Sequence, residues 1–295
     1  MAIDFKALAA KAVEAGGDQS VAKKGGGDRE VAAAGPGLCR FVAYIETGKQ
    51  VKKFQGKDTV YEEVILVFEL VGKRHPPTVL EDGTVLPHRV TVREKLSLNE
   101  KANFFKLFNR LNYKQTAKHL AELLGEGFKC EVVHDKWTGR DGKERVDITL
   151  RNEAGYTLAP PRKEDEDSET GWVDVAVPPA TSDLRLFLWQ HADLEQWASL
   201  YIEGEYPERK DDKGNVTAPA RSKNTFQNRI VGAKNFEGSV IHELLVSNGT
   251  KLDFKKIAAE LAEEDDQAAA PAEAEQAPPA QQATAPAADA LGGIV

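Results

Sequence analysis

The stretch 41-FVAYIETGKQVKKFQGKDTVYEEVILVFEL-70 decides the fold, because it holds two strand-like runs on either side of a short basic arm. The runs, residues 38–47 and 60–71, are rich in β-branched and aromatic residues, and a polar segment with a glycine separates them. Such a pattern predicts two strands joined as a hairpin. The arm combines one aromatic side chain with four cations: Phe54, Lys49, Lys52, Lys53 and Lys57. We therefore expect the tip of this hairpin to be basic.

Three more strands and a helix are predicted further along the chain. Residues 88–96 alternate apolar and polar side chains, which is typical of a half-buried strand. The segment 97-SLNE-100 has the form of a capping box, and apolar side chains then follow at helical spacing, with a second helical piece at 117–124. Strand patterns return at residues 127–134 and 145–151. The predicted order is strand, strand, strand, helix, strand, strand.

This order is that of the OB-fold, a five-stranded Greek-key barrel with a helix between strands 3 and 4. We therefore predict a mostly β protein with added helices, in which residues 37–157 form an OB-fold-like barrel. Such barrels bind oligonucleotides or oligosaccharides through the face of strands 2–3 and through the 1–2 and 4–5 loops. Here the 1–2 loop is the lysine arm, and the 4–5 loop is 134-HDKWTGRDGKER-145. Both loops combine cations with an aromatic residue.

The composition around the barrel predicts four further segments. Residues 1–36 suggest a short helix and a glycine-rich lead-in, and residues 158–183 form a proline-rich acidic linker or an extended arm over the core. Residues 184–261 are dense in large apolar groups, so we expect an α-helical and irregular extension that packs on the barrel or forms a small second domain. Residues 262–295 contain no aromatic residue and cannot bury enough apolar surface to offset their ordering entropy, which predicts a disordered tail.

Several classes of protein do not fit the sequence. No run approaches eighteen apolar residues and no secretory signal is evident, so we expect a cytoplasmic protein without a membrane span. Cys39 and Cys130 each lie within a strand-like run, which favours buried free thiols. The six histidines are scattered singly, and no nucleotide-binding, metalloprotease or hydrolase motif is present. We therefore expect no catalysis, no cofactor and no metal.

The charge of the chain is distributed unevenly. The net charge is −8, yet residues 37–150 carry 20 Lys and Arg against 16 Asp and Glu. Residues 261–295 contain seven acidic residues and no basic ones. A basic body beside an acidic tail indicates a polyanion-binding surface and a tail that competes for it, although an excess of this size is also found on ordinary protein surfaces.

Several blocks of the sequence resemble the single-stranded DNA-binding proteins of tailed bacteriophages. These blocks are 37-GLCRFVAYIETGKQ-50, 60-VYEEVILVFEL-70, 92-VREKLSLNEKANFFKLFNRL-111, 184-LRLFLWQHADLEQWASLYIEGEY-206 and 222-SKNTFQNRIVGAKNFEGS-239. The resemblance covers roughly residues 37–245. It implies a role in phage DNA replication and recombination, in which the protein coats and protects exposed strands.

Non-specific strand binding requires cations along the backbone and aromatic faces for the bases. The candidate stacking platforms are Phe54, Tyr61 and Trp137. The candidate phosphate contacts are Arg40, Lys49, Lys52, Lys53, Lys57, Arg93, Lys95, Lys136, Arg140, Lys143 and Arg145. In the tail, an acidic cluster is the candidate contact for replication or recombination proteins: Glu263, Glu264, Asp265 and Asp266.

Two other interpretations stay open at this point. The chain could be a virion or assembly protein that uses the barrel as an interaction module, with the lysine arm against a neighbouring subunit. It could also be a barrel that binds carbohydrate or protein. Strand binding differs from both in its steep dependence on salt.

Overall fold

The structure, a computed structural model, describes residues 31–54, 57–80, 83–138, 144–210 and 214–250. The fold is mostly β, with few helices and one open sheet whose neighbouring strands are mainly antiparallel. Its strands are β1 (Gly35–Phe54), β2 (Lys57–Val71), β5 (Arg89–Lys95), β6 (Gly127–Thr138), β7 (Glu144–Thr149) and β12 (Arg185–Phe187). They lie in the order β5-β2-β1-β6-β7, and β12 adds to β1 in parallel.

The predicted hairpin is formed by β1 and β2, and it is longer than the sequence suggested. Strand pairing continues to Phe54↔Lys57, so the lysine arm is the end of a two-stranded ribbon and not a loop. β1 contains two bulges, each with one extra residue, at Val42 and at Thr47. Gly48 follows the second bulge with φ +74°, and an added Cβ there would lie 2.4 Å from the ring of Trp189. This position therefore requires glycine.

The sheet does not close into the barrel that we expected. Among the described residues, no strand pairing joins β5 to β7. Side chains span the opening in place of a ladder: Glu94 at the end of β5 accepts a hydrogen bond from the Tyr156 hydroxyl and lies 4.0 Å from Arg151. Within the main sheet, the order of β1, β2 and β5, then helix α2, then β6 and β7 nevertheless agrees with the sequence prediction.

The helix between β5 and β6 is α2 (Asn103–Leu111), and it begins later than the predicted capping box. The Ser97 hydroxyl accepts from the Asn99 backbone N–H, and the Asn99 side chain accepts from Lys101, so these groups stabilise a turn before the helix. The second predicted helical piece is a single 3-10 turn, η1 (Leu120–Leu123).

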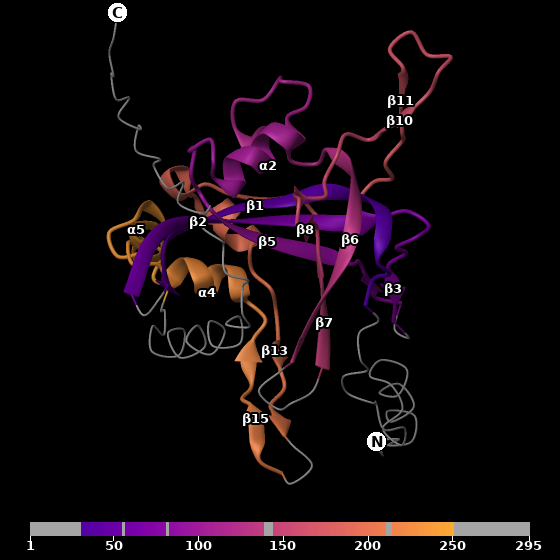
Figure 1. Ribbon diagram of the computed structural model, residues 1–295. Coiled ribbons are helices and arrows are strands. Elements are labelled where there is room, and N and C mark those ends of the chain that lie inside the picture. The colour runs from indigo at the N-terminus through magenta and orange to yellow at the C-terminus, as the bar shows by residue number, and fades with distance from the viewer. Residues whose placement is uncertain (1–30, 55–56, 81–82, 139–143, 211–213, 251–295) are drawn as a thin grey trace, which may run out of the picture.

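One face of the sheet, called here the inner face, packs against α2 and η1. Its core includes Phe41, Phe68, Leu107 and Phe128, all almost fully buried. The two thiols belong to this core as well, and both Cys39 and Cys130 are free and buried, as predicted. Figure 1 shows α2 above the sheet.

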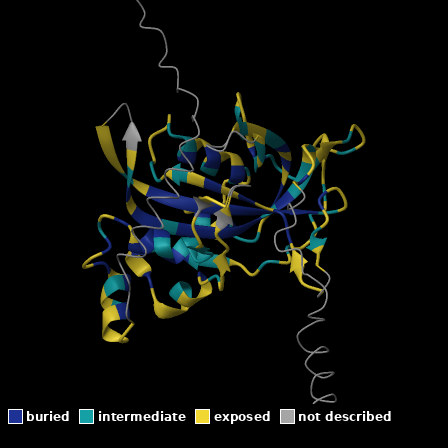
Figure 2. Ribbon diagram, turned by 90° about the horizontal axis from the view of Figure 1, so that it is seen from below, coloured by how far each residue is buried: buried dark blue, intermediate teal, exposed yellow. Residues whose placement is uncertain are grey.

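The opposite, outer face of the sheet is covered by the second half of the chain. This extension contains β12, η2 (Trp189–His191), α3 (Leu194–Ser199), α4 (Thr225–Val231) and α5 (Val240–Ser247). Its apolar side chains, including Trp189 and Phe236, form one core cluster with Ile45, Ile65 and Val67 of the sheet. The extension therefore packs on the sheet and shares its core. Figure 2 shows the central strands buried and the projecting ends exposed.

Five short antiparallel strand pairs complete the described fold. They are β3 (Thr78–Val79) with β4 (Val85–Leu86), β8 (Arg151–Asn152) with β9 (Gly155–Tyr156), β10 (Arg162–Glu164) with β11 (Trp172–Asp174), β13 (Glu205–Tyr206) with β16 (Arg221–Ser222), and β14 (Arg209–Lys210) with β15 (Val216–Ala218). The proline-rich segment 158–183 thus contains a hairpin, followed by an extended stretch that lies on the sheet.

The ends of the chain are partly outside the described residues. Residues 1–30 and 251–295, including the predicted acidic contact Glu263–Asp266, are not described. At the start of the described chain, side chains bind the backbone carbonyls of three consecutive residues. A ring nitrogen of His134 contacts the Ala32 carbonyl, a ring nitrogen of His75 contacts the Ala33 carbonyl, and Arg74 donates to the Ala34 carbonyl. Among the described residues, no helix combines the length and the apolar character that crossing a membrane requires.

Candidate nucleic-acid interface

The projecting end of β1 and β2, residues 49–60, is called here the first arm, and its two faces differ in charge. Because side chains alternate along a strand, the register decides which lysines share a face. On one face Lys49 pairs with Glu62, and Lys53 pairs with Asp58, so each lysine position lies opposite a carboxylate. On the other face, which continues the outer face of the sheet, Lys52 pairs with Thr59.

The outer face of the first arm is therefore cationic without a carboxylate on it. Lys57 pairs with Phe54 and Gln50 pairs with Tyr61 on this same face. Lys52 and Lys57 are both exposed. The side chains of Lys53 and Phe54 lie outside the described part of the chain, so the proposed stacking role of Phe54 rests on the sequence alone.

The first arm is anchored at its base by a buried ion pair. Arg229 of α4 binds Glu63 of β2 through two contacts, Nε to Oε1 at 2.9 Å and Nη2 to Oε2 at 3.0 Å. The hydroxyl of Thr47 also donates to Oε1 at 3.0 Å, and the side-chain amide of Gln50 donates to the Arg229 carbonyl at 3.0 Å. Since these side chains are nearly all inaccessible to solvent, the root of the arm is fixed to the extension.

Tyr61, a predicted stacking platform, belongs to the same anchor. It is half-buried, and its hydroxyl donates to Oε2 of Glu63 at 2.9 Å. Burial raises the pKa of Glu63, but the hydrogen bonds and charge of Arg229, with smaller contributions from Tyr61 and Arg93, outweigh burial and lower it overall. The carboxylate is thus ionised at neutral pH, and the Tyr61 ring has a fixed position at the base of the arm.

Next to this base, the outer face of β5 carries a row of exposed cations. Arg89, Arg93 and Lys95 alternate with the buried Val90 and Val92. Lys95 pairs with Glu63 of β2, so the row begins where the first arm leaves the sheet. The predicted residues Arg93 and Lys95 therefore share the outer face with Lys52 and Lys57. Arg89 was not predicted from the sequence, although it lies in phase with the other two.

The outer face of β2 itself is not open to a ligand, in contrast to the expected binding face of strands 2–3. Ile65 and Val67 are covered by the extension, and Glu63 is covered by Arg229. Glu69 is captured by the backbone N–H groups and hydroxyls of Thr181 and Ser182. The extension occupies this face because its apolar side chains match the outward-facing valines and isoleucines.

Arg40, a predicted phosphate contact, has a structural role in the fold. Its guanidinium donates to the carbonyl oxygens of Gly125, Val177 and Pro178. Arg40 and Glu69, which are directly paired across β1 and β2, thus hold the stretch 177–182 against the outer face. The Arg40 side chain is therefore committed to backbone carbonyls and is removed from the set of candidate contacts.

Arg185 is a further cation on the outer face, and the sequence analysis did not predict it. Arg185 of β12 is half-buried, and its guanidinium carbon lies 6.0 Å from the ring centre of Phe226. Burial lowers the pKa of Arg185, repulsion from Arg89 lowers it further, and Asp183 acts in the opposite direction. Because β12 and β5 are far apart in sequence, the pattern of either strand alone could not predict that the two arginines lie close together.

The second arm is formed by β6 and β7, residues 135–147, and it contains the other predicted aromatic. Trp137 is half-buried and pairs with Arg145, whose guanidinium carbon lies 5.1 Å from the ring centre. The indole N–H donates to Asp147 at 2.8 Å. Lys136 is exposed, whereas Arg140 and Lys143 lie outside the described residues.

The two arms project in different directions. In Figure 1 the first arm leaves the sheet at the left, and the second arm extends downward. The described ends of the two arms are therefore not adjacent, and they do not form one joint surface. The structure brings together Lys52, Lys57, Lys95 and Arg93 on one face, while Lys136, Trp137 and Arg145 form a separate group.

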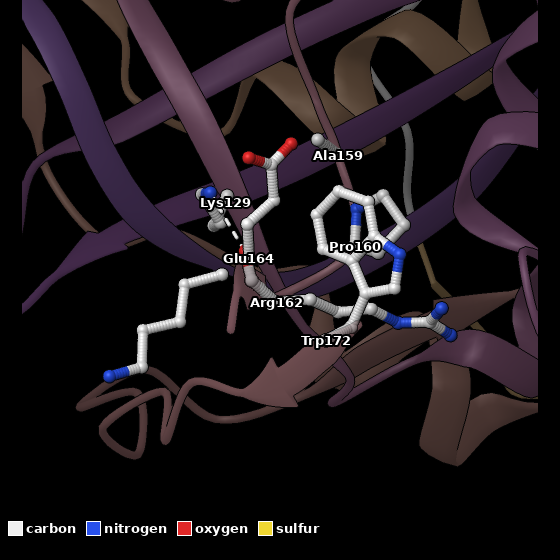
Figure 3. Close-up of a pocket in the computed structure, with 7 residues that line it drawn as sticks. Lys129, Ala159, Pro160, Arg162, Glu164 and Trp172 are labelled. Atoms are coloured by element: carbon white, nitrogen blue, oxygen red, sulfur yellow. Dashed lines mark hydrogen bonds between the residues drawn. The ribbon is translucent and has the colours of Figure 1, made fainter. Parts of the chain in front are cut away.

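A cavity of about 640 Å³ lies apart from these groups, at the base of the β10–β11 hairpin. Figure 3 shows the rings of Pro160 and Trp172 near one another, with Lys129 and Glu164 to the left of them. Lys129 Nζ donates to the Arg162 carbonyl at 2.9 Å. The cavity lining carries three cations and one carboxylate, but it belongs to β6 and the β10–β11 hairpin, so it does not extend the cationic row.

Comparisons of the chain with models of known protein families, with curated proteins and with solved structures found no match. The interpretation of the site therefore rests on its geometry and charge.

Proposed function

We propose that the protein binds single-stranded DNA without sequence preference and coats exposed strands during phage DNA replication and recombination. The observation that carries this proposal is the division of charge on the first arm. Carboxylates lie opposite Lys49 and Lys53 on one face, whereas Lys52 and Lys57 share the other face with neutral residues. That second face continues into Lys95 and Arg93 of β5. The result is a set of cations on one continuous face, which suits a phosphate backbone.

We further propose that the sheet is an OB-fold barrel opened between β5 and β7. The strand order and the position of α2 between the third and fourth strands support this assignment. Because the extension covers the usual binding face, the strand would follow the rim formed by the first arm and β5. The Tyr61 ring at the base of the arm and the Trp137 ring on the second arm are the described aromatic platforms for bases.

The test compares two double variants that remove the same charge from opposite faces of the first arm. Lys52→Gln with Lys57→Gln removes the outer-face cations, and Lys49→Gln with Lys53→Gln is the matched control. Binding of fluorescently labelled oligo-dT is measured by anisotropy over a range of salt concentrations. The outer-face variant should bind more weakly, and its dependence of log K on log salt should flatten by about 0.7 for each phosphate that the variant no longer neutralises.

The control variant should keep most of the affinity and the wild-type salt slope. Equal losses in the two variants would show that the arm contributes general charge and no oriented surface. Absence of a complex between the wild-type chain and oligo-dT at low salt would reject strand binding altogether.

A second candidate function, an assembly protein, is favoured by one observation. The β10–β11 hairpin projects away from both arms in Figure 1 and exposes Trp172 and Val173. An exposed aromatic on a projecting hairpin suits a protein contact. If this function is the main one, Trp172→Ser will abolish self-association in sedimentation experiments, and oligo-dT binding will be absent from the wild type.

A further inference from the structure

The region 205–222 lies within the extension that was expected to be α-helical and irregular, but it is a two-stranded ribbon. β13 pairs with β16, and β14 pairs with β15 further along the same hairpin. Figure 1 shows this ribbon extending downward from the body of the molecule, as the second arm does. Because an isolated two-stranded ribbon is only marginally stable, the contacts between its side chains matter for its structure.

The ribbon repeats the aromatic–cation arrangement of the second arm. On the second arm Trp137 pairs with Arg145, and the guanidinium carbon lies 5.1 Å from the ring centre. On the ribbon Tyr206 pairs with Arg221, and the corresponding distance is also 5.1 Å. Two hairpins without shared sequence thus place an arginine opposite an aromatic residue in the same register.

A second cation is held over Tyr206 by the backbone at the base of the ribbon. The Lys223 ammonium lies 5.6 Å from the ring centre, and the Lys223 backbone N–H donates to the Gly204 carbonyl at 3.0 Å. Gly204 has φ +97°, and the Lys223 side chain passes 3.6 Å from where a Cβ would be. An added Cβ would make only an ordinary van der Waals contact with the lysine stem, so it is the positive φ that favours glycine at this position. The ring itself remains 43% exposed.

We propose that the ribbon is a further strand-contacting element, in which Tyr206 stacks on a base while Arg221 and Lys223 lie near the flanking phosphates. This inference rests on the proposed binding of single-stranded DNA. An aromatic face beside two cations is the combination that recognises a nucleotide without regard to sequence. The protein would then contact a strand at the first arm and β5, at the second arm and at the ribbon.

The test uses the full chain and three single variants: Tyr206→Leu, Tyr206→Phe and Tyr201→Leu. Tyr201 is the matched control, because it is 56% exposed and has no cation over its ring among the described residues. Anisotropy with long oligo-dT should show a loss of roughly fivefold or more for Tyr206→Leu, since one stacked base contributes at least that much. Tyr206→Phe keeps the ring and should retain the affinity, and Tyr201→Leu should bind like the wild type.

A cross-linking experiment locates the contact directly. Oligo-dT containing 5-iododeoxyuridine is irradiated with the wild-type chain, and adducts are mapped by mass spectrometry, with Tyr206 expected among the modified residues. Wild-type affinity in Tyr206→Leu, or adducts confined to the two arms, would overturn the proposal while leaving strand binding intact. Failure of the wild-type chain to bind any oligo-dT would instead reject the proposed function and this inference together.

Discussion

The two halves of the β1–β2 hairpin use charge in opposite ways. In the half that belongs to the sheet, Glu63, Glu69 and Arg40 are surrounded by partners from the rest of the chain. In the projecting half, Lys52 and Lys57 are exposed and lie opposite neutral residues. The same two strands therefore carry charges that hold the fold together and, a few residues further, charges that are open to a ligand.

This difference shows why residue type alone does not identify a binding site. Arg40 and Lys52 are equivalent candidates in the sequence, but the Arg40 guanidinium is occupied by three carbonyl groups. A buried charge is retained where its partners offset the desolvation, whereas a surface charge costs little and stays accessible. The variants below separate these two kinds of charge, first by stability and then by binding.

The largest effect is expected when the anchor loses its cation. Arg229→Met leaves the Glu63 carboxylate buried without its bidentate partner, and breaking a buried pair in this way costs about 3–5 kcal/mol of unfolding free energy. Urea denaturation followed by circular dichroism measures the change. The double variant Glu63→Gln with Arg229→Met should recover part of the loss, because no buried charge is then unpaired. A single-variant cost no larger than that of an exposed substitution would contradict the anchoring role.

A smaller loss is expected at the other captured carboxylate. Glu69→Ala removes the acceptor for the backbone and hydroxyl donors of Thr181 and Ser182, at a cost of about 2 kcal/mol. The same change should expose the stretch 177–182 to limited proteolysis. Glu62→Ala, at an exposed position of β2 beside the first arm, is the control and should shift stability by less than about 0.5 kcal/mol. Equal protease resistance in the wild type and Glu69→Ala would show that Arg40 alone holds this stretch.

The pH dependence of stability follows from the same two carboxylates. Burial raises the pKa of both Glu63 and Glu69, but hydrogen bonds from Arg229 and from Thr181 and Ser182 respectively lower it overall. The stabilisation is therefore fully present above the unfolded-state pKa of about 4.3 and is lost as the pH falls through the lower folded-state values. Thermal melts between neutral and acidic pH should show this loss, and Glu69→Gln should make the acid limb shallower. An unchanged limb in that variant would assign acid unfolding to other groups.

The smallest effect on stability is expected for substitutions in the projecting half of the β1–β2 hairpin. Lys52→Gln with Lys57→Gln should change the unfolding free energy by less than about 0.5 kcal/mol, because both side chains are exposed. The same variant is the one expected to lose affinity for oligo-dT. A cost comparable to that of Glu69→Ala would mean that these lysines take part in the fold, and the contrast between the two halves would disappear.

The parts of the fold that depend on local pattern were predictable from the sequence. The hairpin, the alternating strand β5 and the helix before β6 all follow from spacing within a few residues. The run 64-VILVFELV-71 is apolar except at Glu69, and such a run is typical of a strand that is buried on both faces. The extension covers the second face of this strand, which explains why the outer face of β2 is not open to a ligand.

The parts that depend on distant contacts were not predictable. Glu63 and Arg229 are 166 residues apart in the chain, and nothing near either of them indicates the other. The ribbon at 205–222 was missed because its strands are two or three residues long and contain few β-branched residues. The pairing of Tyr206 with Arg221 could have been noticed only after its register was known.

The two bulges in β1 have a consequence for which lysines meet a ligand. Each extra residue, at Val42 and at Thr47, reverses which of the following residues face the inner side of the sheet. The two bulges together therefore restore the alternation that the strand has before Val42. With one bulge fewer, Lys49 and Lys53 would share a face with Tyr61, and Lys52 would be turned away. A homologue of the same length that lacked one of the two bulges would therefore exchange its set of exposed cations without altering one lysine.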